Sequence, residues 1–238
     1  YKRQVETSVI MATYKESIEC LKQSIESIIN QTYNDFEFII ILDNPDNKEH
    51  IAFINDYVCK DERIKFYIND KNMGLTNTLN RGLKLAEGKY ICRMDADDIS
   101  DPRRLEIEKE YLDEHGECDF VGGRGQFFIQ DIGDDQETYW FCKTPKAKDF
   151  LFSVPFVHAS CMFRKEALQK VHGYDTTKKR VRMEDYDMLL RLYANGCYGS
   201  NVEDILYYIR RDENQYKRRK YRYRWNEAKM KYQGFSSL

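Results

Sequence analysis

The sequence predicts an α/β domain in which a mostly parallel central sheet is flanked by helices. Short apolar runs typical of buried strands alternate with amphipathic stretches of about 10 to 15 residues. Several of these apolar runs end abruptly in polar residues, as strands do where they open into loops. With 238 residues, of which 42% are hydrophobic and 33% charged, the chain is long enough for a large core under a hydrated surface.

The first hundred residues alternate strands and helices in a regular order. Residues 36–42 (FEFIIIL) are almost continuously apolar, which predicts a central strand buried on both faces. Helices are expected where apolar residues recur at helical spacing, as Ile18, Leu21 and Ile25 do. In chain order, we expect a strand at 5–13, a helix at 18–29, a strand at 36–42, a helix at 48–59, a strand at 64–68, a helix at 75–85 and a strand at 89–94.

The remainder of the chain is less regular. Asp101 and Pro102 are a helix start signal, with the acid at the N-cap and proline in the first turn. Its helix should run to about Glu114. The later expected elements are a strand at 119–129, an acidic irregular loop at 130–145, a strand at 156–163, a short helix to 171, a helix at 184–194 and a strand at 202–209. Residues 1–210 thus form one domain with a regular half (1–100) and an irregular half (101–210), followed by a basic tail at 211–238.

Composition excludes several classes of protein. A net charge of −2 and a pI near 6.2 argue against a uniformly basic nucleic-acid binder. The seven cysteines are evenly spread and contain no C-x-x-C pair, which favours reduced thiols over a disulfide framework or a zinc site. No apolar run approaches the roughly 20 residues that span a bilayer. A cytoplasmic protein is expected.

Carboxylates gather where two predicted strands end. Asp43 follows one strand, and Asp95, Asp97 and Asp98 follow another. The carboxyl ends of parallel strands are where open α/β sheets bind ligands. Acids this close repel each other unless a cation neutralises them, and oxygen ligands suit Mg²⁺ or Mn²⁺. The alternative is a helix cap and solvated loop acids beside Asp101.

Six segments together resemble glycosyltransferase family 2 of the GT-A type. The resemblance covers about residues 5–210, and the motifs occur in the family's order. The segments are 8–17 (SVIMATYKES), 30–46 (NQTYNDFEFIIILDNPD), 72–98 (NMGLTNTLNRGLKLAEGKYICRMDADD), 157–164 (VHASCMFR), 173–175 (GYD) and 184–192 (EDYDMLLRL). Two departures leave the donor sugar open: L-D-N-P stands where D-D-G-S is more usual, and Lys15 where asparagine is usual.

The resemblance implies transfer of a sugar from a nucleotide-diphosphate sugar, with inversion at the anomeric carbon, to a glycan or lipid-linked acceptor. UDP-sugar is the expected donor. Asp97, with Asp95 or Asp98, would hold Mn²⁺ or Mg²⁺ against the diphosphate. In related enzymes the segment around His158 lies near the metal, so this histidine is a further ligand candidate. A lone histidine on an apolar strand is otherwise a satisfied core residue.

The resemblance also assigns side chains to the nucleotide sugar. Without it, these would count as ordinary loop residues, and the ring of Tyr14 as a packing ring. Arg93 and Arg104 flank the acidic cluster and could equally pair with it. The assigned residues are Thr13, Tyr14, Glu16, Asp43, Asn72, Arg93 and Asp95.

Asp185 is the expected general base for the acceptor hydroxyl. With Leu189 and Leu192 it falls at i, i+4 and i+7, which places its carboxylate on the buried face of a helix. A helix N-terminus also favours its ionised form. Glu184 would support it or bind the acceptor. The alternative is a pair of first-turn acids that only complement the helix dipole.

Two further features remain open. Tyr139 and Trp140, in the acidic loop, are either acceptor-site aromatics or anchors of that loop. Residues 217–232 hold eight lysines and arginines and one acid. This stretch would be solvated, pair with the acidic body, or lie peripherally on the inner face of an anionic membrane. Nucleic acid is not expected.

Two other functions remain as alternatives. A sugar-phosphate nucleotidyltransferase also uses an acidic metal site on a related sheet, but it needs a glycine-rich loop after the first strand, where this chain has ATYKES. A non-enzymatic membrane or nucleic-acid docking module would instead depend on the basic tail.

Overall fold

Strand β2 (Phe36–Leu42) is buried along its whole length in the computed structural model, which describes residues 5–151, 153–177 and 183–211. Its successive side chains point to opposite faces of the sheet. Ile39 and Ile41 belong to one hydrophobic core, and Phe38 and Ile40 to the other. The sheet is therefore covered on both faces, as the run FEFIIIL predicts.

The described strands form one sheet in the order β3-β2-β1-β4-β7-β6-β8-β5. Strands β3, β2, β1 and β4 are mutually parallel, and so are β6 and β8. Strand β7 is antiparallel to both of its neighbours, and the short β5 is antiparallel to β8. The other bounds are β1 (Thr7–Thr13), β3 (Ile64–Ile68), β4 (Tyr90–Asp95), β5 (Ile99–Ser100), β6 (Phe120–Phe128), β7 (Met162–Arg164) and β8 (Gly199–Arg210).

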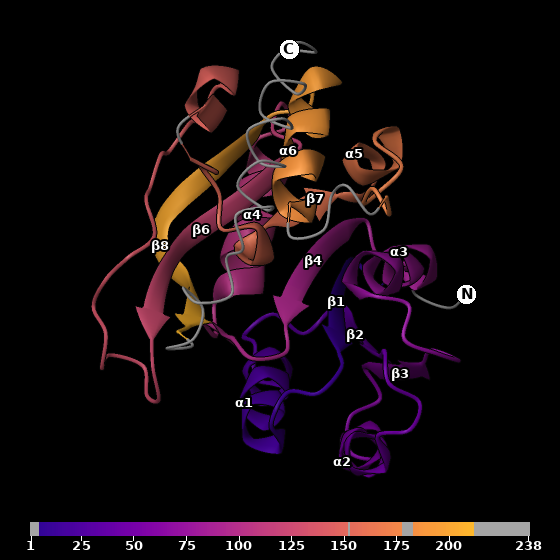
Figure 1. The fold of residues 1–238 in the computed structure, drawn as a ribbon. Helices are drawn as coiled ribbons and strands as arrows, with labels where there is room; N and C mark the ends of the chain where they lie inside the picture. The colour runs from indigo at the N-terminus through magenta and orange to yellow at the C-terminus, as the bar shows by residue number, and fades with distance from the viewer. Residues whose placement is uncertain (1–4, 152, 178–182, 212–238) are drawn as a thin grey trace, which may run out of the picture.

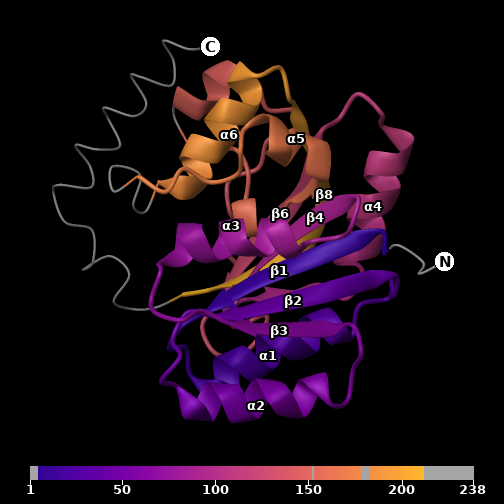
Figure 2. The same cartoon turned by 90° about the vertical axis from the view of Figure 1, so that its right-hand side faces the viewer.

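Helices cover the two faces in separate layers (Figure 1; Figure 2). Helices α1 (Ile18–Ile29), α2 (Lys48–Val58) and α4 (Arg104–Glu114) pack on the core that contains Phe38. Helices α3 (Leu75–Leu85), α5 (Lys165–Lys170) and α6 (Glu184–Ala194) pack on the core that contains Ile39. Two short 3₁₀ turns, η1 (Ala147–Leu151) and η2 (His158–Ser160), complete the described elements.

The strand predicted at 156–163 is wrong over most of its length. Residues His158–Ser160 form the η2 turn, and only Met162–Arg164 pair as a strand. The hydroxyl of Ser160 lies 2.8 Å from the carbonyl of Val157 and accepts a bond from the N–H of Gly123. A serine that bonds the nearby backbone in this way offers an alternative to the strand ladder.

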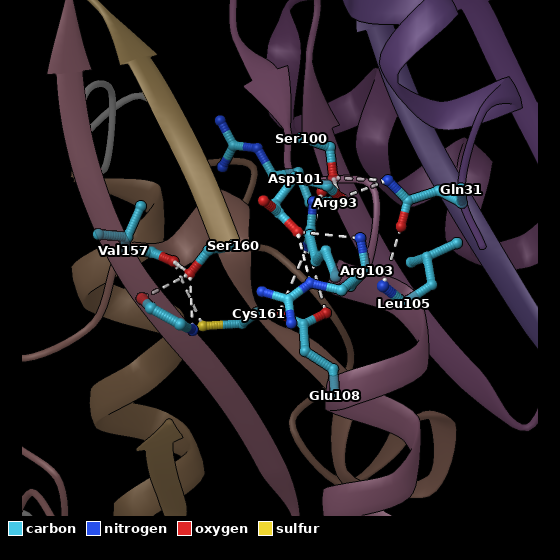
Figure 3. A network of polar contacts seen from close by, with 12 residues as sticks. Gln31, Arg93, Ser100, Asp101, Arg103, Leu105, Glu108, Val157, Ser160 and Cys161 are labelled. Carbon is cyan, nitrogen blue, oxygen red and sulfur yellow. Dashed lines mark hydrogen bonds and ion pairs between the residues drawn. The ribbon is translucent and has the colours of Figure 1, made fainter. Parts of the chain in front are cut away.

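The start of the helix predicted after Asp101 is also corrected. Helix α4 begins at Arg104 rather than at Pro102, and the Asp101 carboxylate accepts from the N–H of Arg103 at 2.9 Å, just before that start. Gln31, two residues after the end of α1, also bonds this turn: its amide donates to the carbonyl of Asp101 at 2.6 Å and accepts from the N–H of Leu105 at 3.0 Å (Figure 3). Part of the capping thus comes from a distant segment, which explains why local sequence misplaced the start of the helix.

A buried carboxylate, that of Glu37, lies at the edge of the sheet where β1, β2 and β4 begin. Glu37 accepts bonds from Ser8 Oγ and from the N–H of Glu87, both at 2.6 Å, and pairs with Lys65 at 2.5 Å. The N–H of Gly88 donates to Ser8, and a Cβ at Gly88 would lie 2.7 Å from the Ser8 nitrogen. The glycine before β4 therefore allows the backbone to approach this network closely.

Glu37→Gln should destabilise the protein by about 2 kcal/mol at pH 7. Burial alone would raise the pKa of Glu37, but Lys65, Ser8 and Glu87 together lower it below its usual value. Its contribution is thus present above the unfolded pKa and lost as the pH falls through the folded one. Urea unfolding from pH 7 to pH 3 should show the deficit shrinking below pH 4.5. A constant deficit, or an equal one in the exposed control Glu110→Gln, would contradict this.

Among the described residues, no helix is both long and apolar enough to cross a membrane. The basic stretch 217–232, for which membrane contact was one expectation, lies outside the described residues.

Candidate active site

Three parallel strands deliver their ends to one edge of the sheet. Thr13 of β1 is paired with Leu42 of β2, and Ala12 with Asp95 of β4. The N–H of Asp43 donates to the carbonyl of Thr13 at 2.8 Å. The loops that carry the predicted nucleotide and metal residues therefore start side by side, at the edge where α/β sheets bind ligands.

The first of these loops is organised by Glu16. Its carboxylate accepts bonds from Thr13 Oγ1 at 2.7 Å and from the N–H groups of Tyr14 and Lys15 at 2.8 and 3.1 Å. Three donors on one oxygen hold the loop in a tight turn. The ring of Tyr14 stays exposed at the edge of the sheet. The structure thus brings Thr13, Tyr14 and Glu16 together.

Asp43 is buried and shapes the start of α3. Its carboxylate accepts bonds from the N–H groups of Met73 and Gly74, both at 2.8 Å, and from the amide of Asn69 at 2.7 Å. Gly74 has φ +84°, a conformation that glycine adopts without strain. Asn72, next to this turn, is exposed. The turn is therefore fixed before any ligand arrives.

The three acids after β4 diverge. Asp95 accepts a two-pronged ion pair from Arg93, at 2.7 and 3.2 Å. Asp98 is buried, and its carboxyl accepts from the N–H of Arg210; burial and the neighbouring acids raise its pKa well above the usual value. Asp97 reaches solvent, yet burial of its surroundings and the charges of Asp95 and Glu16 raise its pKa to about 6.

This arrangement limits how a metal could be held. Among the described residues, no three of His, Cys, Asp and Glu are placed to hold an ion by themselves. Asp97 lies in a field of like charge that opposes its own ionisation, which is the environment a cation would relieve. Mg²⁺-type ions commonly bind one or two carboxylates, with phosphate oxygens and water completing the shell. The donor set at this edge fits that mode.

Arg93 joins the acidic loop to α6. The buried guanidinium donates through Nε to Asp95 and through Nη1 to Asp185 Oδ1 at 2.5 Å. Asp185 stands in the first turn of α6, 40% exposed. Burial alone would raise the pKa of Asp185, but the Arg93 guanidinium beside it lowers it below the usual value. The carboxylate is therefore ionised and open to solvent.

A second set of side chains closes around Asp185. The imidazole of His158 lies 3.6 Å from Asp185 Oδ1, and its Nε2 bonds the hydroxyl of Tyr174 at 2.9 Å. Burial lowers the pKa of His158 to about 4, so the ring is neutral. Glu184 lies beside Asp185, and burial together with that neighbouring charge raises its pKa. His158 therefore lies between Asp185 and Tyr174, as a neutral ring beside the Asp185 carboxylate.

Arg104 and Glu108 form a fully buried ion pair beside Arg93, and Figure 3 labels Glu108 and Arg93. Arg104 donates to Glu108 at 3.2 Å and, through Nη2, to the carbonyl of Arg93 at 3.1 Å. The sequence left open whether Arg93 and Arg104 pair with the acidic cluster. Arg93 does so, whereas Arg104 pairs with Glu108, four residues on in its own helix. The buried Arg104–Glu108 pair therefore fixes the backbone of Arg93 through the bond from Arg104 to its carbonyl.

Several residues of the site were missed in the sequence. Asn69 binds Asp43, and Tyr207 accepts from the N–H of Asp95 at 3.0 Å. Asn69 directly follows the strand at 64–68, so the rule that selected Asp43 could have selected it. Tyr207 lies inside the strand predicted at 202–209 and Arg210 directly follows it. Both are more than a hundred residues from Asp95, where no local signal marks them. Trp140, an acceptor candidate, is exposed.

Comparison with known proteins gives the class of this site. Residues 8–172 match the model of the family described as glycosyl transferase family 2. The uncharacterized glycosyltransferase MJ1057 of Methanocaldococcus jannaschii is 40% identical over 84% of this chain and 68% of its own. A UDP-Gal:alpha-D-GlcNAc-diphosphoundecaprenol beta-1,3-galactosyltransferase of Escherichia coli is 31% identical over 89% of this chain and 76% of its own.

Solved structures agree on the fold. TarS 1-349 of S. aureus in complex with UDP-GlcNAc superimposes with a TM-score of 0.71 at 21% identity, over 91% of this chain. The mannosyltransferase PcManGT of Pyrobaculum calidifontis in complex with GDP-Man and Mn²⁺ gives 0.70 at 16% identity, over 99% of this chain. The chain spans 61% and 64% of the length of those two chains.

The fold is that of the GT-A glycosyltransferases, and the protein is a glycosyltransferase enzyme. The chain belongs to glycosyl transferase family 2. The resemblance drawn from the sequence motifs is confirmed.

Arg93→Met should destabilise the protein by about 2 kcal/mol, because it leaves Asp95 and Asp185 without their shared cation. Asp185→Asn in the same background should restore part of that loss. A double-mutant cycle in urea measures the coupling, expected at about 1 kcal/mol or more. Arg103→Met, at an exposed arginine, is the matched control. Strict additivity of the two single changes would contradict the ion pair.

Proposed function

We propose that the chain transfers a sugar from a nucleoside diphosphate sugar to a hydroxyl group of a glycan or lipid-linked acceptor, with inversion. The observation that carries the proposal is Asp185, a half-exposed carboxylate kept ionised by Arg93. It lies at the end of the sheet that also presents the loops of Thr13, Asp43 and Asp95. The proposed general base and the proposed donor site thus lie at the same edge of the sheet, where an acceptor hydroxyl could meet both.

The donor is proposed to be a UDP-sugar, bound by the first hundred residues through Thr13, Tyr14, Glu16, Asp43 and Asn72. The names of two proteins similar to this chain include a UDP-sugar, whereas PcManGT was solved with GDP-Man. Residues 101–210 would bind the acceptor. The name of the E. coli relative specifies a diphosphoundecaprenol acceptor. A lipid-linked acceptor of that kind would bring the enzyme to the inner face of a membrane.

Asp97 and Asp95 are proposed to hold Mn²⁺ or Mg²⁺ against the donor diphosphate. The bound ion would supply neutralisation of the charge on the departing nucleoside diphosphate. The raised pKa of Asp97 supports this assignment, since the side chain already lies against the charges of Asp95 and Glu16. His158, a further candidate ligand from the sequence, contacts Asp185 and Tyr174, so we assign it to positioning the base.

The proposed reaction is a single displacement. The acceptor oxygen attacks the anomeric carbon on the face opposite the diphosphate, and its proton passes to Asp185. The bond between the anomeric carbon and the diphosphate oxygen breaks as the new glycosidic bond forms. Arg93 holds the carboxylate in place and keeps it ionised before the proton arrives. Glu184, next to it, would bind or orient the acceptor.

Asp185→Asn should lower kcat by about 10³-fold or more, in view of the loss of the base. Asparagine keeps an oxygen for Arg93, so folding and UDP binding should persist. Asp187→Asn is a matched control in the same helix, because Asp187 pairs with Arg191. The test is single-turnover kinetics, with the anomeric configuration of the product read by NMR. Full activity in Asp185→Asn would overturn the base, and retention of configuration would overturn the displacement.

Asp97→Ala should abolish the part of UDP binding that depends on Mn²⁺. Calorimetric titration of UDP, GDP and CMP, each with and without Mn²⁺, measures it. Wild-type protein should prefer UDP and bind it at least tenfold more tightly with the ion. The exposed control Asp56→Ala, on α2, should behave as wild type. Metal-dependent binding that survives in Asp97→Ala would contradict the assignment.

A further inference from the structure

Arg210, at the end of β8, lies beside the loop of residues 95–98 that follows β4. Strand β8 runs parallel to β6, its neighbour in Figure 1, and Arg210 is paired there with Phe128. The guanidinium carbon of Arg210 lies 4.3 Å from the centre of the Phe128 ring. A cation is attracted to the face of an aromatic ring, so Phe128 supports the guanidinium from one side.

The guanidinium group of Arg210 joins three segments that are far apart in the sequence. Nε donates to the carbonyl of Asp97 at 2.8 Å, and Nη1 donates to the carbonyl of Ile129 at 3.2 Å. Nη2 donates to the side-chain oxygen of Gln23 on α1. The group is planar and its donors have fixed directions. The three bonds therefore set the 95–98 loop against α1 and the end of β6.

The backbone of β8 holds the same loop at both of its ends. At one end, the N–H of Asp95 donates to the hydroxyl of Tyr207 at 3.0 Å. At the other, the N–H of Arg210 donates to the buried carboxylate of Asp98 at 2.8 Å. The carbonyl of Asp98 also accepts from Ser24 Oγ at 2.6 Å. The side chain of Asp98 is thus bonded to β8 inside the protein.

Of the three acids in this loop, Asp97 is the exposed one. The bond from Arg210 Nε to the carbonyl of Asp97 limits rotation of the peptide group that follows it. The direction in which the side chain of Asp97 leaves the backbone is then limited too. A carboxylate that binds an ion depends on neighbouring groups that orient it in this way.

We propose that Arg210 is a positioning residue, which holds the backbone of Asp97 so that this carboxylate can bind the divalent ion. Asp98 anchors Arg210 and is not a ligand of the ion. The inference rests on the proposed function, because it concerns the ion site described there. The charge of Arg210 would act in the opposite direction, since a cation beside the site repels a divalent ion. Position and charge therefore predict opposite effects of removing Arg210.

The test is calorimetric titration of UDP with and without Mn²⁺, and the quantity compared is the ratio of the two affinities. In Arg210→Met this ratio should fall at least fivefold, while UDP affinity without the ion stays within twofold of wild type. Arg210→Lys keeps the charge but not the three-pronged geometry, and its ratio should also fall. Arg103→Met removes an exposed arginine and should leave the ratio unchanged. Thermal unfolding verifies that each variant is folded.

Asp98→Asn separates anchoring from ion binding. Asparagine keeps an oxygen that can accept the N–H of Arg210, so the ratio should stay within twofold of wild type. A ligand of the ion would not tolerate this change. A loss in Asp98→Asn as large as that in Asp97→Ala would show that Asp98 binds the ion, and would overturn the inference.

Two results for Arg210 would overturn the inference as well. A ratio in Arg210→Met that is unchanged or higher would show that Arg210 acts only through its charge or not at all. Loss of UDP binding in both Arg210 variants, with and without the ion, would show a general structural role. Wild-type protein that binds UDP equally with and without Mn²⁺ would overturn the ion site itself and this inference with it. Wild-type dependence that persists in Arg210→Met removes this inference and keeps the ion site.

Discussion

One guanidinium group connects the two halves of the molecule. Arg93, at the end of β4, bonds Asp95 in the acidic loop and Asp185 at the start of α6, 92 residues further along the chain. Both carboxylates are close to a single cation that is itself only 8% exposed. Such a cation between two acids fixes their separation, and it lowers the pKa of Asp185. The distance from the proposed donor loops to the proposed base therefore depends on how firmly Arg93 is held.

That firmness comes from the interior. The Arg104–Glu108 pair has no exposed side chain; burial raises the pKa of Glu108, and the neighbouring arginine opposes that rise. Buried ion pairs of this kind contribute little net stability. The role of the Arg104–Glu108 pair is therefore better explained as positioning Arg93. Arg104 bonds the Arg93 carbonyl and lies 5.2 Å from the ring centre of Tyr207, whose hydroxyl accepts from Asp95. Bonds to the Arg93 carbonyl and to the Asp95 N–H thus fix the backbone on either side of Met94.

Much of the fold was predictable from the sequence because the signals for its strands and helices are local. Continuous apolar runs predicted β1, β2 and β4, and the acids that follow β2 and β4 indicated the edge of the sheet that carries the candidate site. The contacts that decide geometry are not local. Gln31, just after α1, helps to cap α4, and Ser160 replaces a strand ladder with bonds to Gly123. Nothing in the residues around Asp101 or His158 announces a partner more than thirty positions away, so the helix start and the strand at 156–163 were misplaced.

The direction of one short strand explains why the distant segments converge. Strand β7 runs antiparallel to β4, with Met162 opposite Cys92 and Arg164 opposite Tyr90. Residues before Met162 therefore lie toward the carboxyl edge, which puts His158 beside the end of β4. Strands β6 and β8 run parallel to each other, so β8 brings Tyr207 and Arg210 to the same edge. A parallel β7 would point the segment before it toward the amino edge, away from Asp185. The reversal after a regular half is what allows the irregular half to complete the site.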